Sequence, residues 1–137
     1  MLKQAPEADK AVADINILMS SMTGKSFTKE QLINYYTAKK YMPLHLKSED
    51  DRTIKKKINP QGFTIPDSDT ENLIQCLLHM RRIITVHEGL RWNDIKRYGI
   101  EISHNRDGQA DDVLLVDDLR RAIQICLLYT SPSPRDA

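Results

Sequence analysis

The chain has 137 residues, of which 40% are hydrophobic and 28% are charged, and its formal net charge is +1 at pH 7. These values are ordinary for one globular domain, and the near-neutral charge argues against a nucleic acid or an anionic membrane surface as a partner. No run of 18 apolar residues is present, so the sequence contains no candidate membrane-spanning helix.

Two helices are predicted in the first third of the chain. Residues 6–22 carry apolar side chains at helical spacing, with Pro6 in the first turn and Gly24 as the stop. Thr28 and Gln31 form a capping box, which predicts a second helix that runs to about residue 40. Residues 41–67 mix charges and prolines with few apolar residues, and they are therefore expected to form a long surface loop.

A third helix of about thirty residues is predicted over residues 69–98. Ser68 and Glu71 have the spacing of a capping box at its start, and Gly99 follows two basic residues at its end. Gly89 would cost about 1 kcal/mol inside this helix relative to alanine, so we expect a bend or the close approach of another backbone there. The apolar face of this helix is expected to include Leu73, Leu77, Met80, Ile84, Ile95 and Tyr98.

Charged residues of this helix recur at intervals of three, as Glu88, Arg91, Asp94 and Arg97. Alternating charges at this spacing meet on a helix surface, and each pair contributes roughly 0.2–0.5 kcal/mol. The row therefore predicts either a solvated ion-pair ladder or a face that docks a partner helix. Trp92 is expected to be a core anchor, and Cys76 a buried, unreactive thiol.

The residues after Gly99 predict little regular structure. Residues 100–102 alternate like a short strand, 105–108 read as a turn, and 113–116 form a brief apolar run. Asp117, Asp118 and Glu101 could supply paired carboxylates for acid–base chemistry. Because Arg120 and Arg121 follow directly, a turn held by ion pairs is the favoured interpretation.

Other candidate sites are weak, and no constellation points to an enzyme or a cofactor. His79 and His87 would be about 12 Å apart on a helix, too far to share one metal ion. The Lys55–Lys57 run follows three acidic residues, which favours a solvated loop over a phosphate site. Tyr35, Tyr36, Tyr41 and Phe63 could stack against a sugar, but local packing is the more common use of such residues.

The sequence at the end of the chain indicates a DNA-sequencing artefact. Residues 126–136 read Cys-Leu-Leu-Tyr-Thr-Ser-Pro-Ser-Pro-Arg-Asp, and their reverse translation in one frame matches a transposase adapter used in DNA sequencing. We therefore interpret residues 126–137 as adapter sequence translated in frame and exclude them from fold reasoning. The natural part is expected to be residues 1–125.

Residues 81–99 resemble the signature helix of the SusD/RagB family, which has the form Glu-Arg-x-x-Glu-x-x-x-Glu-Gly-x-Arg-Trp/Phe-x-Asp-Leu/Ile-x-Arg-x-Gly. The matching residues are Arg81, Glu88, Gly89, Arg91, Trp92, Asp94, Ile95, Arg97 and Gly99. Met80 and Ile84 depart from the pattern, because the family usually has glutamates there, and His87 and Asn93 stand where aromatic residues are common. Asp118, Arg120 and Arg121 resemble the start of a later family element, Asp-x-Arg-Arg followed by Ile-Pro-Gln.

The resemblance covers roughly residues 70–125. It implies a mainly α fold with little strand, in which residues 1–125 would be part of the C-terminal region of a tetratricopeptide-like SusD scaffold. Family members are lipoproteins on the external face of the outer membrane. They partner a SusC-like, TonB-dependent transporter and bind oligosaccharides or peptides for uptake, without catalysis. The lipid anchor would lie outside this chain, and a structural role is implied for the signature residues. A free-standing helical protein–protein interaction module is the alternative.

Overall fold

The computed structural model describes residues 5–104 and 110–122, which form a mainly helical structure with one small hairpin. Its α-helices are α1 (Ala5–Thr23), α2 (Lys29–Thr37), α3 (Ser68–Ile84) and α4 (Arg91–Arg97). The strands are β1 (Ile102–His104) and β2 (Asp112–Leu114), and short 3-10 turns cover Glu49–Asp51 and Leu119–Arg121. The predicted mainly α class with little strand is confirmed.

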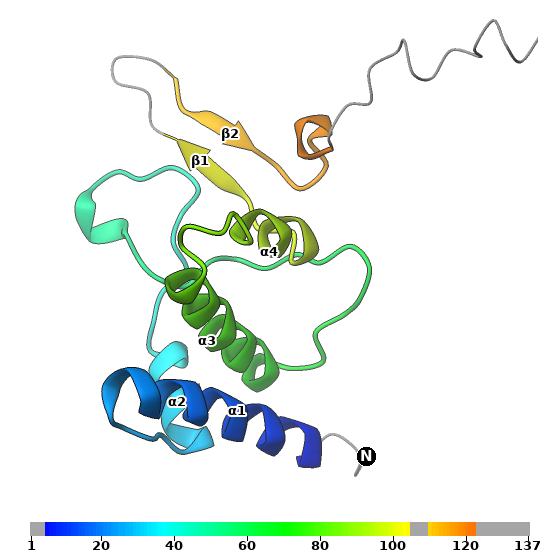
Figure 1. Cartoon of the computed structure of the whole chain (residues 1–137). Coiled ribbons are helices and arrows are strands. Elements are labelled where there is room, and N and C mark those ends of the chain that lie inside the picture. Colours follow the sequence, from blue (N-terminus) through cyan, green and yellow to red (C-terminus); the bar gives the residue numbers. More distant parts are fainter. Residues whose placement is uncertain (1–4, 105–109, 123–137) are drawn as a thin grey trace, which may run out of the picture.

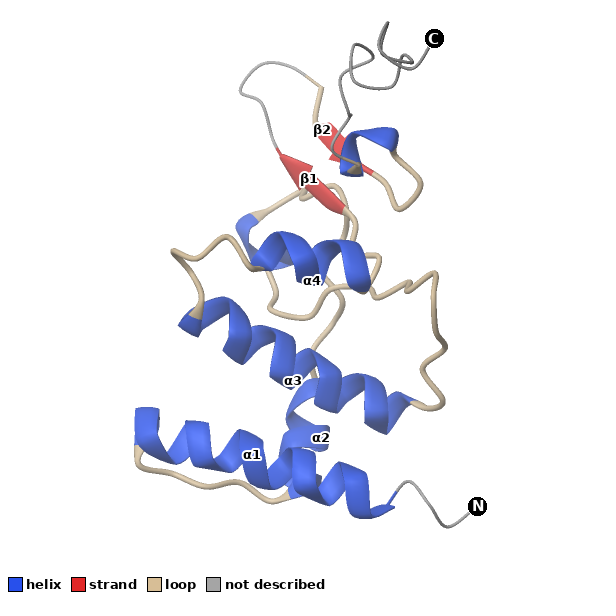
Figure 2. Cartoon of the chain, turned by 45° about the vertical axis from the view of Figure 1, so that its right-hand side comes forward, coloured by secondary structure: helices blue, strands red, loops and turns tan. Residues whose placement is uncertain are grey.

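α3 is the central element, and the other described helices and the hairpin lie on its two sides (Figures 1 and 2). α1 and α2 lie on one side and share a core with Leu73, Cys76 and Met80 of α3. α4 and the hairpin lie on the other side, where Leu78 packs with Ile95 and Ile100. The chain therefore has two apolar clusters that meet across one helix.

The predicted apolar face of this helix is correct only in part. Leu73 and Met80 are buried, but Leu77 and Ile84 are 39% and 43% exposed. The buried residues of the first cluster follow the spacing 73, 76 and 80, which places Cys76 at the centre of the face. Cys76 is buried as expected, and its burial raises the pKa of the thiol.

Most predicted helix ends agree with the structure to within a few residues. α1 ends at Thr23 before Gly24, and Thr28 caps α2 through the predicted reciprocal contacts with Gln31. α2 ends at Thr37, a little earlier than predicted. The N-cap of α3 is Asp67, not Ser68, because the Asp67 carboxylate accepts a hydrogen bond of 2.7 Å from the Thr70 amide.

The prediction of one continuous helix over residues 69–98 is wrong. α3 ends at Ile84, and α4 begins at Arg91 after a turn in which Gly89 has a φ of +69°. The Thr85 side chain donates to the Arg81 carbonyl at 2.7 Å, a local contact that competes with helix propagation. The turn lets α4 pack its own apolar residues beside α3.

The predicted loop over residues 41–67 contacts the core at several points. Tyr41 and Lys55 form a parallel bridge, and the Lys55 ammonium donates to the Tyr36 carbonyl at 2.9 Å and to the Asn72 side chain at 2.8 Å. Lys55 is therefore buried, where the sequence had favoured a solvated loop. Further along, the Asn59 amide donates to the Tyr98 carbonyl at the end of α4.

The hairpin is antiparallel, with Ser103 paired to Val113. The predicted strand over 100–102 is shifted, because Ile100 is buried at the end of α4 and the strand begins only at Ile102. The predicted turn at residues 105–108 and the adapter interpretation of residues 126–137 both lie outside the described residues.

Candidate functional site

An ion pair between Arg81 and Asp94 joins the end of α3 to α4. The guanidinium lies 3.1 Å from Oδ1 of Asp94, and its Nε donates to Oδ2 at 3.3 Å. Asp94 is only 4% exposed, so this contact is partly desolvated. The sequence had placed Asp94 in a ladder with Glu88, Arg91 and Arg97. That continuous ladder is wrong, because Glu88 lies in the turn before α4.

Gly99 ends α4 in a left-handed conformation, with a φ of +56°. The Ile100 amide donates to the Ile95 carbonyl at 3.0 Å, which is the contact of a Schellman motif. A Cβ at this position would lie 1.8 Å from the Asn59 carbonyl oxygen. The close backbone approach that the sequence suggested at Gly89 therefore occurs at Gly99, while Gly89 accounts for the change of direction.

Arg121 anchors the hairpin to α4 through backbone carbonyls. Its guanidinium donates to the carbonyl oxygens of Ile100 at 2.6 Å and Leu114 at 3.1 Å, with further contacts to those of Ile95 and Leu115. Arg121 is buried. A buried guanidinium can be satisfied by several carbonyl dipoles, and here those dipoles come from residues 6 to 26 positions away.

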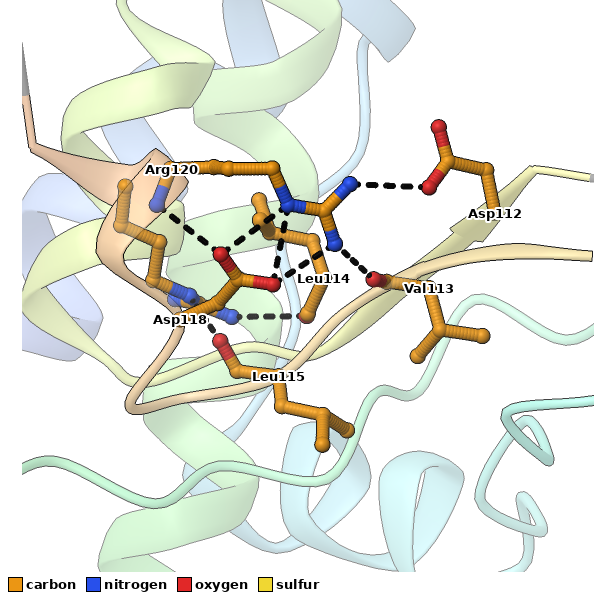
Figure 3. A network of polar contacts seen from close by, with 7 residues as sticks. Asp112, Val113, Leu114, Leu115, Asp118 and Arg120 are labelled. Atoms are coloured by element: carbon orange, nitrogen blue, oxygen red, sulfur yellow. Dashed lines mark hydrogen bonds and ion pairs between the residues drawn. The ribbon is translucent and has the colours of Figure 1, made fainter.

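The neighbouring Arg120 lies at the surface and makes a different network (Figure 3). Its guanidinium contacts Asp118 at 2.6 Å and Asp112 at 2.9 Å, and it also donates to the Val113 carbonyl. The Arg120 hydrogen bonds hold the pKa of Asp118 below its usual range. The predicted turn held by an ion pair is thus confirmed for Asp118 and Arg120, and Glu101 is not brought into that network.

The remaining signature residues lie around the same cluster. Trp92 is partly buried against Leu78, Ile95 and Ile100, in agreement with its expected role as an apolar anchor. The Arg97 guanidinium lies over the Phe63 ring at 5.9 Å. Trp92 therefore packs α4 against α3, and Arg97 contacts the long loop.

A separate pocket lies between the 41–57 loop and the start of the hairpin, and its volume is about 270 Å³. The lining residues are Tyr41, Met42, Pro43, Leu44, Leu46, Lys56, Lys57, Glu101, Ser103 and Asp111. This volume lies just below the roughly 300–1,000 Å³ of typical small-ligand pockets, so the pocket suits only a small part of a solute. An aromatic ring, two carboxylates, a hydroxyl and two amines are the groups that can hold a polyol or a peptide backbone.

A hydrogen bond to α3 holds the Tyr41 side chain beside this pocket. Its hydroxyl donates to Glu71 at 2.7 Å, and burial together with that bond raises the pKa of Tyr41 to about 12. His45 Nδ1 lies 2.8 Å from Oδ2 of Asp111, which lines the pocket. Sequence reasoning missed Ser103 and Asp111 as pocket residues, because the lining comes from segments more than forty residues apart. Only a tertiary contact could have linked them.

The other candidate sites are not assembled. Tyr35 and Tyr36 pack edge to face at 5.2 Å, and Phe63 packs on Tyr98, so the four predicted aromatic residues do not share one platform. His79 Nδ1 lies 3.0 Å from the Tyr36 hydroxyl. Within residues 5–104 and 110–122, no three His, Cys, Asp or Glu side chains are grouped as metal ligands.

No helix in the described part of the chain has the length and apolarity needed to cross a membrane. Comparisons with protein-family models, with curated proteins and with solved structures gave no match to this chain.

Proposed function

We propose that this chain is part of a surface-exposed solute-binding component of a TonB-dependent nutrient-uptake system, and that it binds a glycan or peptide without catalysis. The observation that carries the proposal is the SusD/RagB-like pattern over residues 81–99. Three of its positions make contacts that fit a structural signature. Arg81 pairs with Asp94, and Gly99 admits the Asn59 backbone.

The pocket beside Tyr41 is the place where we propose that the solute binds. It combines an aromatic ring with Glu101, Ser103 and Asp111, and a sugar can use such a site by stacking its apolar face while its hydroxyls bond to the polar groups. The signature residues, in this proposal, support the pocket from behind and do not contact the solute.

The proposed partner is a SusC-like transporter, and the proposed location is the external face of the outer membrane through a lipid anchor on the parent protein. The intact gene provides the first test. A lipoprotein signal upstream and a neighbouring TonB-dependent barrel gene are expected. An intact locus that encodes a short polypeptide without an exported precursor would refute the proposal.

A binding experiment tests the proposed pocket directly. Oligosaccharides and short peptides are titrated into the ¹⁵N-labelled chain, with amide shifts expected at residues 41–46 and 101–103. Tyr41→Ala should abolish the shifts, whereas Tyr35→Ala, which removes an exposed ring outside this pocket, should not. Shifts confined to another surface would rule out the pocket.

The alternative function, a helical interaction module, relied on a docking face from Glu88 to Arg97. That face is not one helical surface, because the turn at Gly89 separates Glu88 from α4. This form of the alternative therefore lacks the continuous helical face on which it relied.

A further inference from the structure

An apolar pocket lies where the end of α1, the α1–α2 connection, α2 and the second half of α3 meet. Its volume is about 470 Å³, which is within the roughly 300–1,000 Å³ of typical small-ligand pockets. Most of the lining side chains are methionines, aromatic residues or aliphatic residues, among them Met19, Met22, Met80, Phe27, Tyr36 and Ile83. We call it the Met-rich pocket.

Hydrogen bonds within the chain hold two walls of this pocket. The Asn16 side chain donates to the Phe27 carbonyl at 2.7 Å and accepts from the Phe27 amide at 2.8 Å, which ties the α1–α2 connection to α1. The Asn72 side chain donates to the Thr37 hydroxyl at 2.9 Å, which ties the end of α2 to α3. The walls are therefore positioned without a ligand, and a preformed site loses little free energy to ordering when a ligand binds.

The lining carries no charge at neutral pH among the residues that the structure describes. None of them is Lys, Arg, Asp or Glu. Burial, with the charge of Arg82, lowers the pKa of His79, so the imidazole is neutral at pH 7. Burial raises the pKa of Tyr36 and of Cys76, so the hydroxyl and the thiol stay protonated. A charged ligand would lose its hydration here without gaining a counter-charge, so the lining favours a neutral ligand.

The side chains of the lining favour a flat aromatic ring. Methionine sulfur atoms make favourable contacts with aromatic rings, and the flexible methionine side chain adapts to the shape of a ligand. The rings of Tyr35 and Tyr36 already pack edge to face at 5.2 Å, and a further ring can join such an arrangement. A cavity of about 150 Å³ accommodates one benzene molecule, so a pocket about three times larger has room for two or three fused rings.

We propose that the Met-rich pocket binds a neutral aromatic molecule of two or three rings that carries few polar groups. The Tyr36 hydroxyl, 3.0 Å from Nδ1 of His79, and the Gln31 side chain are polar parts of the lining that can orient a hydroxyl group of the ligand. The ligand would cover Met22, Tyr35 and Ile83, which are each about half exposed.

This site goes beyond the proposed function and does not rest on it. The described residues that line the Met-rich pocket are all different from those that line the pocket beside Tyr41. Met42 lines the pocket beside Tyr41, whereas Met19, Met22 and Met80 line the Met-rich pocket. The methionine methyl groups therefore report on the two sites separately.

The experiment is ¹H–¹³C NMR of the 137-residue chain labelled with [methyl-¹³C]methionine and titrated with 2-naphthol. The signals of Met19, Met22 and Met80 should shift together with a Kd of about 100 μM or tighter, and the signal of Met42 should stay unchanged. Light scattering on the same samples checks that the chain stays monomeric. Absence of saturable shifts, shifts of Met42 alone, or shifts that appear only in associated chains would overturn the proposal.

Two related probes test the chemistry of the ligand. 2-Naphthoate has the same rings with a carboxylate, and it should bind about tenfold more weakly or worse. Binding as tight as that of 2-naphthol would show that the cations Lys39 and Arg82, outside the lining, control the site, and it would overturn the neutral ligand. Decahydro-2-naphthol keeps the hydroxyl but has no aromatic ring, and it should bind about threefold more weakly or worse. Equal binding would overturn the aromatic preference.

Two neighbouring isoleucines give a matched pair of variants. Ile83 and Ile84 are 48% and 43% exposed at the end of α3, but only Ile83 lines the Met-rich pocket. Ile83→Ala should weaken 2-naphthol binding about threefold or more, because it removes apolar contact area. Ile84→Ala should bind within about twofold of the unmodified chain. Circular dichroism checks that both variants are folded, and equal weakening by the two substitutions would overturn the assignment of the pocket.

Discussion

The two sides of α3 differ in their balance of apolar and directional contacts. On the α1–α2 side the larger apolar cluster is joined by the hydrogen bonds of Lys55 with Tyr36 and Asn72, and several large apolar residues remain exposed, including Ile17 at 70%. On the α4 side a smaller cluster is surrounded by directional contacts from Arg81, Arg121 and Gly99. Apolar contacts tolerate small shifts, but hydrogen bonds and close backbone approaches do not. Substitutions on the α4 side should therefore be more costly and more specific.

The largest effect is expected from Gly99→Ala. The new Cβ would lie 1.8 Å from the Asn59 carbonyl oxygen, and the φ of +56° is also unfavourable for alanine. The free energy of unfolding should fall by about 3 kcal/mol or more, measured by urea denaturation. Gly89→Ala is the control, because it has a φ of +69° but open space, and it should cost only about 1 kcal/mol. Equal costs would contradict the close approach.

The two neighbouring arginines should differ sharply. Arg121→Met should lower the free energy of unfolding by about 2–3 kcal/mol, because it leaves buried carbonyls without a donor. Arg120→Met removes an exposed network that solvent screens, so it should cost far less than Arg121→Met. Thermal melts of both variants give the comparison. If Arg120→Met proved the more damaging, the anchor would have been assigned to the wrong residue.

A smaller loss is expected from Asp94→Asn. The amide keeps the shape of the carboxylate but loses the charge that pairs with Arg81, at a cost of about 1–2 kcal/mol. Asp50→Asn, on the exposed loop, should be neutral within about 0.5 kcal/mol. The double variant Arg81→Met, Asp94→Asn should cost less than the sum of the single variants. Strict additivity would show that the pair is not coupled.

The α1–α2 side should respond to pH through His79. Burial lowers the pKa of His79, so the unfolded chain binds more protons than the folded chain below about pH 6.5. Stability is therefore full above that pH and falls as the pH drops toward the lowered folded pKa, by about 1 kcal/mol at most between pH 7 and 5.5. His79→Gln should reduce this pH dependence in urea titrations, whereas His87→Gln, at an exposed position, should leave it unchanged.

The smallest change in stability is expected from Leu77→Gln. Leu77 is already 39% exposed, so the free energy of unfolding should change by about 0.5 kcal/mol or less. Self-association should decrease, because an exposed apolar patch promotes it. Light scattering during a thermal ramp measures this effect. We expect the unmodified chain to be marginally stable or aggregation-prone, and a sharp, high-temperature monomeric melt would contradict that expectation.

Features that depend on neighbouring residues could be predicted from sequence, whereas features that depend on tertiary contacts could not. The first two helices, the capping box at Thr28 and the stop at Gly99 depend on neighbouring residues, and they were predicted correctly. The break between α3 and α4 lets α4 pack beside α3. The spacing of the charges at Glu88, Arg91 and Asp94 contains no information about that packing. A row of charges three apart fits a helix equally well whether or not it is interrupted.

The candidate sites depend even more on tertiary contacts. The pocket beside Tyr41 is formed by the long loop and a strand that begins at Ile102, and no local pattern connects them. The residue types that line it were visible in the sequence, but their juxtaposition was not.

The burial of Lys55 has a consequence for chemical labelling. Its ammonium group is held by the Tyr36 carbonyl and the Asn72 side chain, so an amine-acylating reagent can reach it only when the loop separates from α2 and α3. The nearby Lys57 is exposed and should react at once. The ratio of the acylation rates of these two lysines would therefore report how often the loop separates from α2 and α3.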